Sequence, residues 1–170
     1  HAQYLAHRQE IHEAIERVLS NGRYILGPEL EALESEFAGY IGTSEAIGVA
    51  NGTDALELAL RVLNIGQGDE VITVSHTAVA TVAAIESAGA TPVLVDVDPF
   101  YYTLNPDLLE SAYTSKTKAV IAVHLYGQSA NMGTISDFCE QHGIRLIEDV
   151  SQAHGAKWDG EKVGSYGRIS

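Results

Sequence analysis

Cysteine is almost absent from the sequence, and long apolar runs and basic residues are scarce. Cys139 is the only cysteine, so the chain can form neither an internal disulfide nor a thiolate metal cluster, and we expect a reducing cytoplasm. No apolar stretch approaches the roughly 20 residues that span a bilayer, and no signal pattern opens the chain. Lys and Arg number 10 against 23 Asp and Glu, and the formal charge of −13 disfavours binding to nucleic acid or anionic membranes.

Several catalytic and binding motifs are missing as well. There is no GxGxxG loop and no Walker loop, which argues against a Rossmann-like or P-loop nucleotide domain. No serine stands in a G-x-S-x-G elbow. His7 and His12 do not share a helix face, so they form a poor metal pair, and we predict no metal site.

Short apolar runs alternate with helical patterns from residue 45 onward. We predict strands at residues 46–50, 70–74, 92–96, 118–123 and 145–147, and helices at 54–63, 78–88, 105–112 and 132–142. This alternation predicts an α/β fold of three αβα layers with a mostly parallel sheet. Residues 1–44 carry two amphipathic helical patterns, so we expect an N-terminal helical segment (1–44) and a larger domain (45–170).

Polar or small residues follow four of the predicted strands. They stand at positions 51–53, 75–77, 124–127 and 149–152. Ligands of parallel sheets bind beyond the carboxyl ends of the strands, so these residues should meet at one edge. The sequence therefore predicts a binding site at that edge.

Two of these segments suggest specific chemistry, each with a simpler alternative. Gly52 and Thr53 precede a helix, where exposed amides can hold a phosphate, although the same turn can be an ordinary helix cap. Asp149 follows a buried strand, and its carboxylate needs a partner: a protonated ring nitrogen, a metal, or the next turn. Gln152 could reach the same ligand, and His154 is either part of the site or a structural histidine.

Taken together, these segments resemble the fold-type-I aminotransferases that use pyridoxal 5'-phosphate (PLP), and more narrowly the DegT/DnrJ/StrS-type sugar aminotransferases. Six segments carry the resemblance: residues 22–29, 50–56, 68–72, 75–81, 124–128 and 147–155. Each is short, but their order and spacing are specific. The chain begins with His1 and ends within the pattern, so we expect a truncated large domain without the family's small domain.

The resemblance implies roles for the matching positions. Gly52 and Thr53 would donate amides to the PLP phosphate, Asp149 would pair with the pyridine nitrogen, and Gln152 would lie near the ring hydroxyl. The lysine that forms a Schiff base with PLP would follow residues 164–167, beyond the last residue of this chain. Four lysines stand elsewhere in the pattern and do not replace it: Lys116, Lys118, Lys157 and Lys162.

One position departs from the family pattern. Ala78 stands where the family usually carries an aromatic side chain stacked on the PLP ring. A methyl group cannot stack, so another group must cover that face of the ring. We suggest His76 as the substitute.

The resemblance also implies a function for the intact protein: a cytoplasmic, homodimeric, PLP-dependent transaminase. It would move an amino group from glutamate to a nucleotide-linked keto-sugar, for deoxyamino-sugar and polysaccharide or antibiotic biosynthesis. Two alternatives stay open: a PLP-dependent sugar dehydratase of the same family, with histidine in place of the lysine, and a non-catalytic binding module that keeps the fold. Without the lysine, these 170 residues alone should be inactive.

Overall fold

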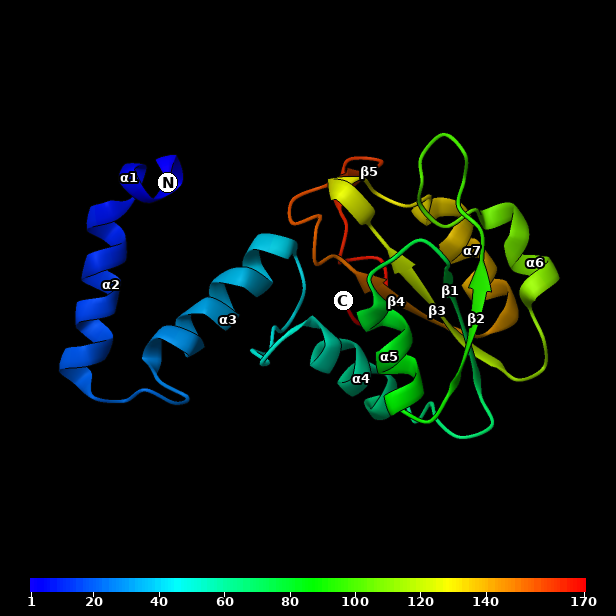
Figure 1. Ribbon diagram of the computed structural model, residues 1–170, viewed down its shortest axis with the longest axis horizontal. Coiled ribbons are helices and arrows are strands. Elements are labelled where there is room, and N and C mark those ends of the chain that lie inside the picture. Colours follow the sequence, from blue (N-terminus) through cyan, green and yellow to red (C-terminus); the bar gives the residue numbers. More distant parts are fainter. The chain divides into compact units, whose positions relative to one another are not determined.

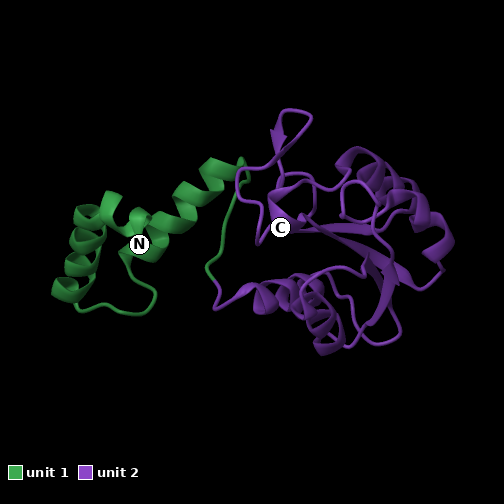
Figure 2. Cartoon of the chain, turned by 45° about the horizontal axis from the view of Figure 1, so that its top comes forward, with its two compact units in different colours: residues 1–48 green, residues 49–170 purple.

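The computed structural model describes residues 1–170 and contains two compact units, residues 1–48 and residues 49–170 (Figure 2). The first unit holds three helices: α1 (Ala2–Ala6), α2 (Arg8–Asn21) and α3 (Pro28–Ile41). Helix α2 ends at Gly22, whose φ of 72° is the left-handed conformation that closes many helices. None of the helices in the chain combines the length and apolar composition needed to cross a bilayer.

The second unit is built on a parallel sheet (Figure 1). Its strands lie in the order β2-β1-β3-β4 and comprise β1 (Glu70–Val74), β2 (Thr91–Val95), β3 (Thr117–Val123) and β4 (Arg145–Asp149). Every neighbouring pair in this sheet is parallel. A separate two-stranded hairpin follows, formed by β5 (Lys157–Trp158) and β6 (Glu161–Lys162).

Helices cover both faces of this sheet, because parallel strands need crossover connections. The two on one face are α4 (Gly52–Val62) and α5 (Val79–Ser87), and the two on the other are α6 (Leu109–Ala112) and α7 (Met132–His142) (Figure 1). Short 3₁₀ turns, η1 (Pro106–Leu108) and η2 (Leu125–Gly127), complete the connections. The predicted α/β fold with a mostly parallel sheet is therefore confirmed.

The outer edge of β4 is occupied by the end of the chain. The Arg168 amide donates to the Leu146 carbonyl at 2.8 Å, and the Glu148 amide donates to the Ile169 carbonyl at 3.0 Å. Ile147 and Ile169 form a parallel bridge. Residues 168–169 thus continue the sheet beyond β4.

The prediction of a strand at residues 46–50 is wrong. These residues form neither strand nor helix, and Ile47 is 81% exposed. A strand needs a neighbour that satisfies its backbone hydrogen bonds, and no segment among residues 1–170 pairs with this one. The Gly48 amide instead donates to the Glu34 carboxylate at 2.7 Å. Apolar composition indicated a strand but could not reveal that no segment of residues 1–170 pairs with it.

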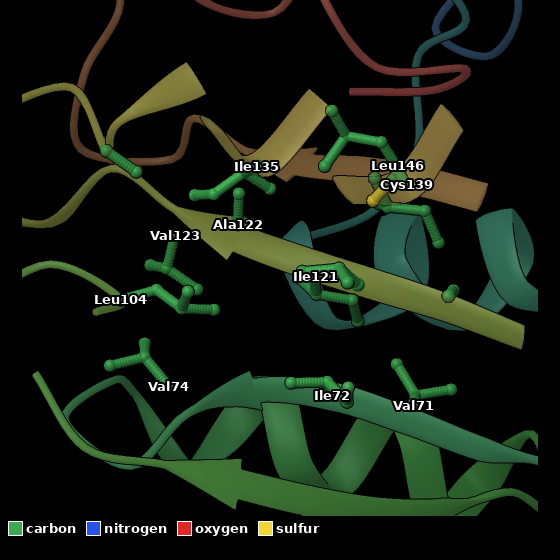
Figure 3. Packing of buried hydrophobic residues seen from close by; sticks show 14 of the residues in the cluster. Val71, Ile72, Val74, Leu104, Ile121, Ala122, Val123, Ile135, Cys139 and Leu146 are labelled. Carbon is green, nitrogen blue, oxygen red and sulfur yellow. The ribbon is translucent and has the colours of Figure 1, made fainter. Parts of the chain in front are cut away.

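The hydrophobic core fills the space between the sheet and its helices. Residues 71–74 of β1 are all buried, as expected for a strand covered on both faces. On α7, Ile135 lies beside Ala122 and Cys139 beside Leu146 (Figure 3). Burial raises the pKa of the Cys139 thiol to about 12, so this cysteine remains protonated and serves as a packing residue.

We expect Leu60→Ala to lower the free energy of unfolding by about 2–5 kcal/mol, because truncating a buried leucine removes apolar contacts and leaves a cavity. Leu58→Ala is the matched control on the same helix. Leu58 is 48% exposed, so its truncation should cost less than about 1 kcal/mol. Urea denaturation followed by circular dichroism measures both losses, and equal values would contradict this description of α4.

Candidate functional site

The polar segments that follow the strands meet at one edge of the sheet. Strands β1, β3 and β4 are neighbours and run in the same direction, so their carboxyl ends lie together. Residues 75–77 follow β1, residues 124–127 follow β3, and Asp149 ends β4. Helix α4 begins close to the same edge, because a Cβ atom added to Gly52 would lie 3.3 Å from the hydroxyl of Ser151, which follows β4.

The start of α4 presents two backbone N–H groups without an acceptor in the chain. Asn51 is the cap: its Oδ1 accepts from the Asp54 amide at 2.9 Å, and its side-chain amide donates to the Asp54 carboxylate at 3.0 Å. The amides of Gly52 and Thr53 come before the first bond within the helix and find no partner. Together with the positive end of the helix dipole, they can bind an anion.

Ser151 joins the start of α4 to Asp149. A Cβ atom added to Gly52 would lie only 3.3 Å from the Ser151 hydroxyl, so glycine permits this close approach. The same hydroxyl donates to Asp149 Oδ1 at 2.6 Å, and the Ser151 amide donates to that oxygen at 3.1 Å. Asp149 Oδ2 accepts no hydrogen bond from the chain, which leaves one carboxylate oxygen available for a cationic ligand.

Tyr126 connects the ends of the other strands. Its amide donates to Gln152 Oε1 at 3.0 Å, and its hydroxyl lies 3.0 Å from His76 Nε2, at hydrogen-bond distance. The two rings have centroids 5.9 Å apart. Tyr126 adopts φ 60° and ψ 20°, a left-handed conformation that is uncommon for residues other than glycine and often found at functional sites. The side chain of Tyr126 is 72% exposed, so the phenol is accessible at this edge.

Other residues singled out from the sequence lie as follows. Ala78 is exposed immediately before α5, on the same segment as His76, and His154 is also exposed. The four lysines that do not match the position of the PLP-binding lysine lie in two regions. Lys116 and Lys118 stand at the amino end of β3, and Lys157 and Lys162 stand on the hairpin. The amino end of β3 is the opposite end of the sheet from Asp149.

Sequence reasoning missed Glu148, whose side chain is fully buried and receives four hydrogen bonds. Its Oε1 accepts from the amides of Tyr166 at 2.8 Å and Gly167 at 2.6 Å. Its Oε2 accepts from the Gly164 amide at 2.7 Å and from His124 Nε2 at 3.2 Å. The available signal was a carboxylate directly after the predicted strand 145–147, because a carboxylate beside a buried strand needs partners.

His124 is buried as well, and its hydrogen bonds indicate its tautomer. The Ala130 amide donates to Nδ1 at 3.0 Å, so Nδ1 carries no hydrogen and Nε2 donates to Glu148. Burial alone would raise the pKa of Glu148, but hydrogen bonds from His124, Gly164 and Gly167 outweigh it and hold the pKa below its ordinary value. Glu148 is therefore a buried, ionised carboxylate.

This lowered pKa predicts how stability depends on pH. A carboxylate with a folded-state pKa below its unfolded-state value of 4.5 stabilises the fold above that value, and the contribution disappears as the pH falls through the folded-state pKa. We expect Glu148→Gln to lose roughly 1–3 kcal/mol at pH 7, because buried amides lose their acceptor. As the solution is acidified, the free energy of unfolding should fall less in the variant than in the unmodified chain.

Chemical denaturation at a series of pH values measures this difference. Glu140→Gln, an exposed carboxylate on α7, is the control and should stay within about 0.5 kcal/mol of the unmodified chain throughout. A Glu148→Gln curve that runs parallel to the unmodified one at acid pH would contradict the assignment of a lowered pKa.

Comparison with known proteins places this chain in a family. The DegT/DnrJ/EryC1/StrS aminotransferase family matches residues 6–170. The dTDP-3-amino-3,4,6-trideoxy-alpha-D-glucose transaminase of Streptomyces venezuelae is 49% identical over 96% of this chain and 43% of its own length. The UDP-N-acetyl-3-dehydro-alpha-D-glucosamine 3-aminotransferase of Acidithiobacillus ferrooxidans is 49% identical over 95% of this chain and 44% of its own length.

Solved structures share the fold. Streptomyces venezuelae DesV in complex with a ketimine intermediate matches with a TM-score of 0.94 and 50% identity, over 96% of this chain and 44% of DesV. Bacillus subtilis NtdA with bound cofactor PMP matches with a TM-score of 0.87 and 32% identity, over 95% of this chain and 36% of NtdA. The chain thus spans less than half the length of these relatives, and its predicted fold-type-I architecture is confirmed. It belongs to the DegT/DnrJ/EryC1/StrS aminotransferase family.

Proposed function

We propose that the intact protein is a PLP-dependent aminotransferase that acts on a nucleotide-linked keto-sugar. One observation carries the proposal: unpartnered amides at Gly52 and Thr53 stand near Asp149, which has an unpartnered carboxylate oxygen. The first group binds an anion and the second a cation. PLP offers both, as a phosphate and a protonated ring nitrogen, so the residues of the site fit this cofactor.

Each residue of the site has a task in this proposal. When bound, PLP supplies an electron sink for amino transfer. Asp149 keeps the ring nitrogen protonated through an ion pair, and Ser151 holds the carboxylate in place through Oδ1. Gln152 uses its Oε1 to accept from the Tyr126 amide, which leaves its side-chain N–H groups to donate to the ring hydroxyl.

The substrates follow from the relatives and from the family resemblance. Relatives named for dTDP- and UDP-linked amino sugars support a nucleoside-diphosphate keto-sugar as the acceptor. We propose glutamate as the amino donor and a homodimer in the cytoplasm as the working form. Residues 45–170 would form part of the PLP-binding domain, preceded by the helical segment 1–44.

The test uses the intact protein reconstituted with PLP. We expect a visible absorption band that disappears when glutamate is added, together with an aminated sugar nucleotide as the product. Asp149→Asn should lower kcat about 10- to 100-fold, because a neutral amide cannot replace a charge-assisted bond worth about 1.5–3 kcal/mol. Asp137→Asn, an exposed change on α7, is the matched control and should leave kcat unchanged.

The outcomes separate the candidate functions. If the protein binds PLP, does not react with glutamate and removes water from a sugar nucleotide, it is the dehydratase and not the aminotransferase. Failure to bind PLP at all would reject the cofactor proposal and leave the non-catalytic binding module.

His76 provides a second test at the same site. We expect His76→Ala to weaken PLP binding about 2- to 10-fold, because an aromatic contact worth about 0.5–1.5 kcal/mol is lost and Ala78 cannot replace it. Tyr126→Phe removes the hydroxyl that contacts His76 and keeps both rings. It should weaken binding less than His76→Ala if ring contact is what matters. A dissociation constant of His76→Ala equal to that of an exposed control, His7→Ala, would refute the substitution of His76 for the missing aromatic.

A further inference from the structure

The Glu148–His124 pair takes no part in the proposed cofactor contacts. All four hydrogen bonds of the Glu148 carboxylate are made to the chain itself, and both side chains are completely buried. A buried carboxylate is costly unless it is fully hydrogen-bonded, and this one is. It stands next to Asp149 at the end of β4.

The carboxylate organises the segment that follows the hairpin. Three of its four donors are backbone amides from residues 164–167, so the turn is folded around one side chain. Gly164 begins this turn with φ 95°, which side chains other than glycine rarely adopt. At Gly167, an added Cβ would lie 3.0 Å from the Leu146 carbonyl and 3.3 Å from the Glu148 side chain. The turn is therefore pressed directly against β4.

The backbone of His124 also contacts Asp149. The His124 amide donates to the Asp149 carbonyl at 3.0 Å, while the His124 ring donates to the Glu148 carboxylate. Glu148 and Asp149 are adjacent in a strand, so their side chains point to opposite faces. One face of the end of β4 thus holds the turn at 164–167, and the other presents the Asp149 carboxylate to the site.

We propose that Glu148 is a positioning residue: it locks residues 164–169 against β4 and thereby sets where the following chain stands relative to Asp149. The proposal rests on the proposed function and on the family resemblance, which implies that the lysine that holds PLP follows residues 164–167. The ladder bonds of Arg168 and Ile169 to β4 extend the effect, because they start only where the turn held by Glu148 ends. His124 supports Glu148 and is in turn oriented by Ala130.

Two readouts on the intact protein test this role. In the cofactor-free protein, hydrogen exchange of a peptide covering residues 163–170 should be at least about 10-fold faster in Glu148→Gln, a larger increase than in a peptide from α4, which reports the general loss of stability. With PLP and substrates, kcat should fall about 10- to 100-fold, the cost of a misplaced catalytic group, while KM for the sugar stays within about threefold. Glu140→Gln is the control and should match the unmodified protein in both.

A second variant disturbs the same turn without touching the charge. Gly167→Ala forces a methyl group against the Leu146 carbonyl and should reproduce both the faster exchange and the loss of kcat. If Glu148→Gln does not fold, Gly167→Ala still tests the positioning role. Faster exchange with unchanged kcat would overturn the positioning role, and unchanged exchange would overturn the anchoring itself. Because exchange is read without cofactor, a failure of the proposed function remains distinguishable from a failure of this inference.

Discussion

Parallel pairing of β1, β3 and β4 is the constraint on which the rest of the second unit depends. Strands that run in the same direction must be joined by crossovers, and the crossovers supply the helices that bury both faces of the sheet. The same constraint gathers the loops after each strand at one edge. The site is a consequence of this topology, because Asp149, Tyr126 and His76 come from three different strand ends.

Local fields matter more than net charge at this site. A chain with a formal charge of −13 repels anions at long range, yet the two unpartnered amides that begin α4 offer an anion fixed donors at short range. The acidic groups near the site each have a partner: the Asp54 carboxylate accepts from the Asn51 side-chain amide, Glu148 from backbone amides and His124, and one oxygen of Asp149 from Ser151. The groups left over for a ligand include one carboxylate oxygen of Asp149, the N–H groups of Gly52 and Thr53, and the side-chain N–H groups of Gln152.

Much of this arrangement could be predicted from the sequence. The helix at 132–142 and the strand at 70–74 agree with α7 and β1 residue for residue, because apolar periodicity and turn residues mark both clearly. The gathering of residues after the strands followed from the alternation of strands and helices. The strand predicted at residues 46–50 is wrong because the composition of a segment does not reveal whether another strand pairs with it. Glu148 and the left-handed turn at Tyr126 were missed because both depend on contacts between distant parts of the chain.

The contact between Gly52 and Ser151 has one more consequence. These residues stand near opposite ends of the second unit in sequence, so the edge exists only after nearly all of the sheet has formed. A ligand that touches both the start of α4 and Asp149 acts as a removable cross-link between the first and last parts of this unit. Because such a ligand binds only the folded chain, it shifts the unfolding equilibrium by mass action, and the cofactor concentration sets what fraction of the chain stays folded.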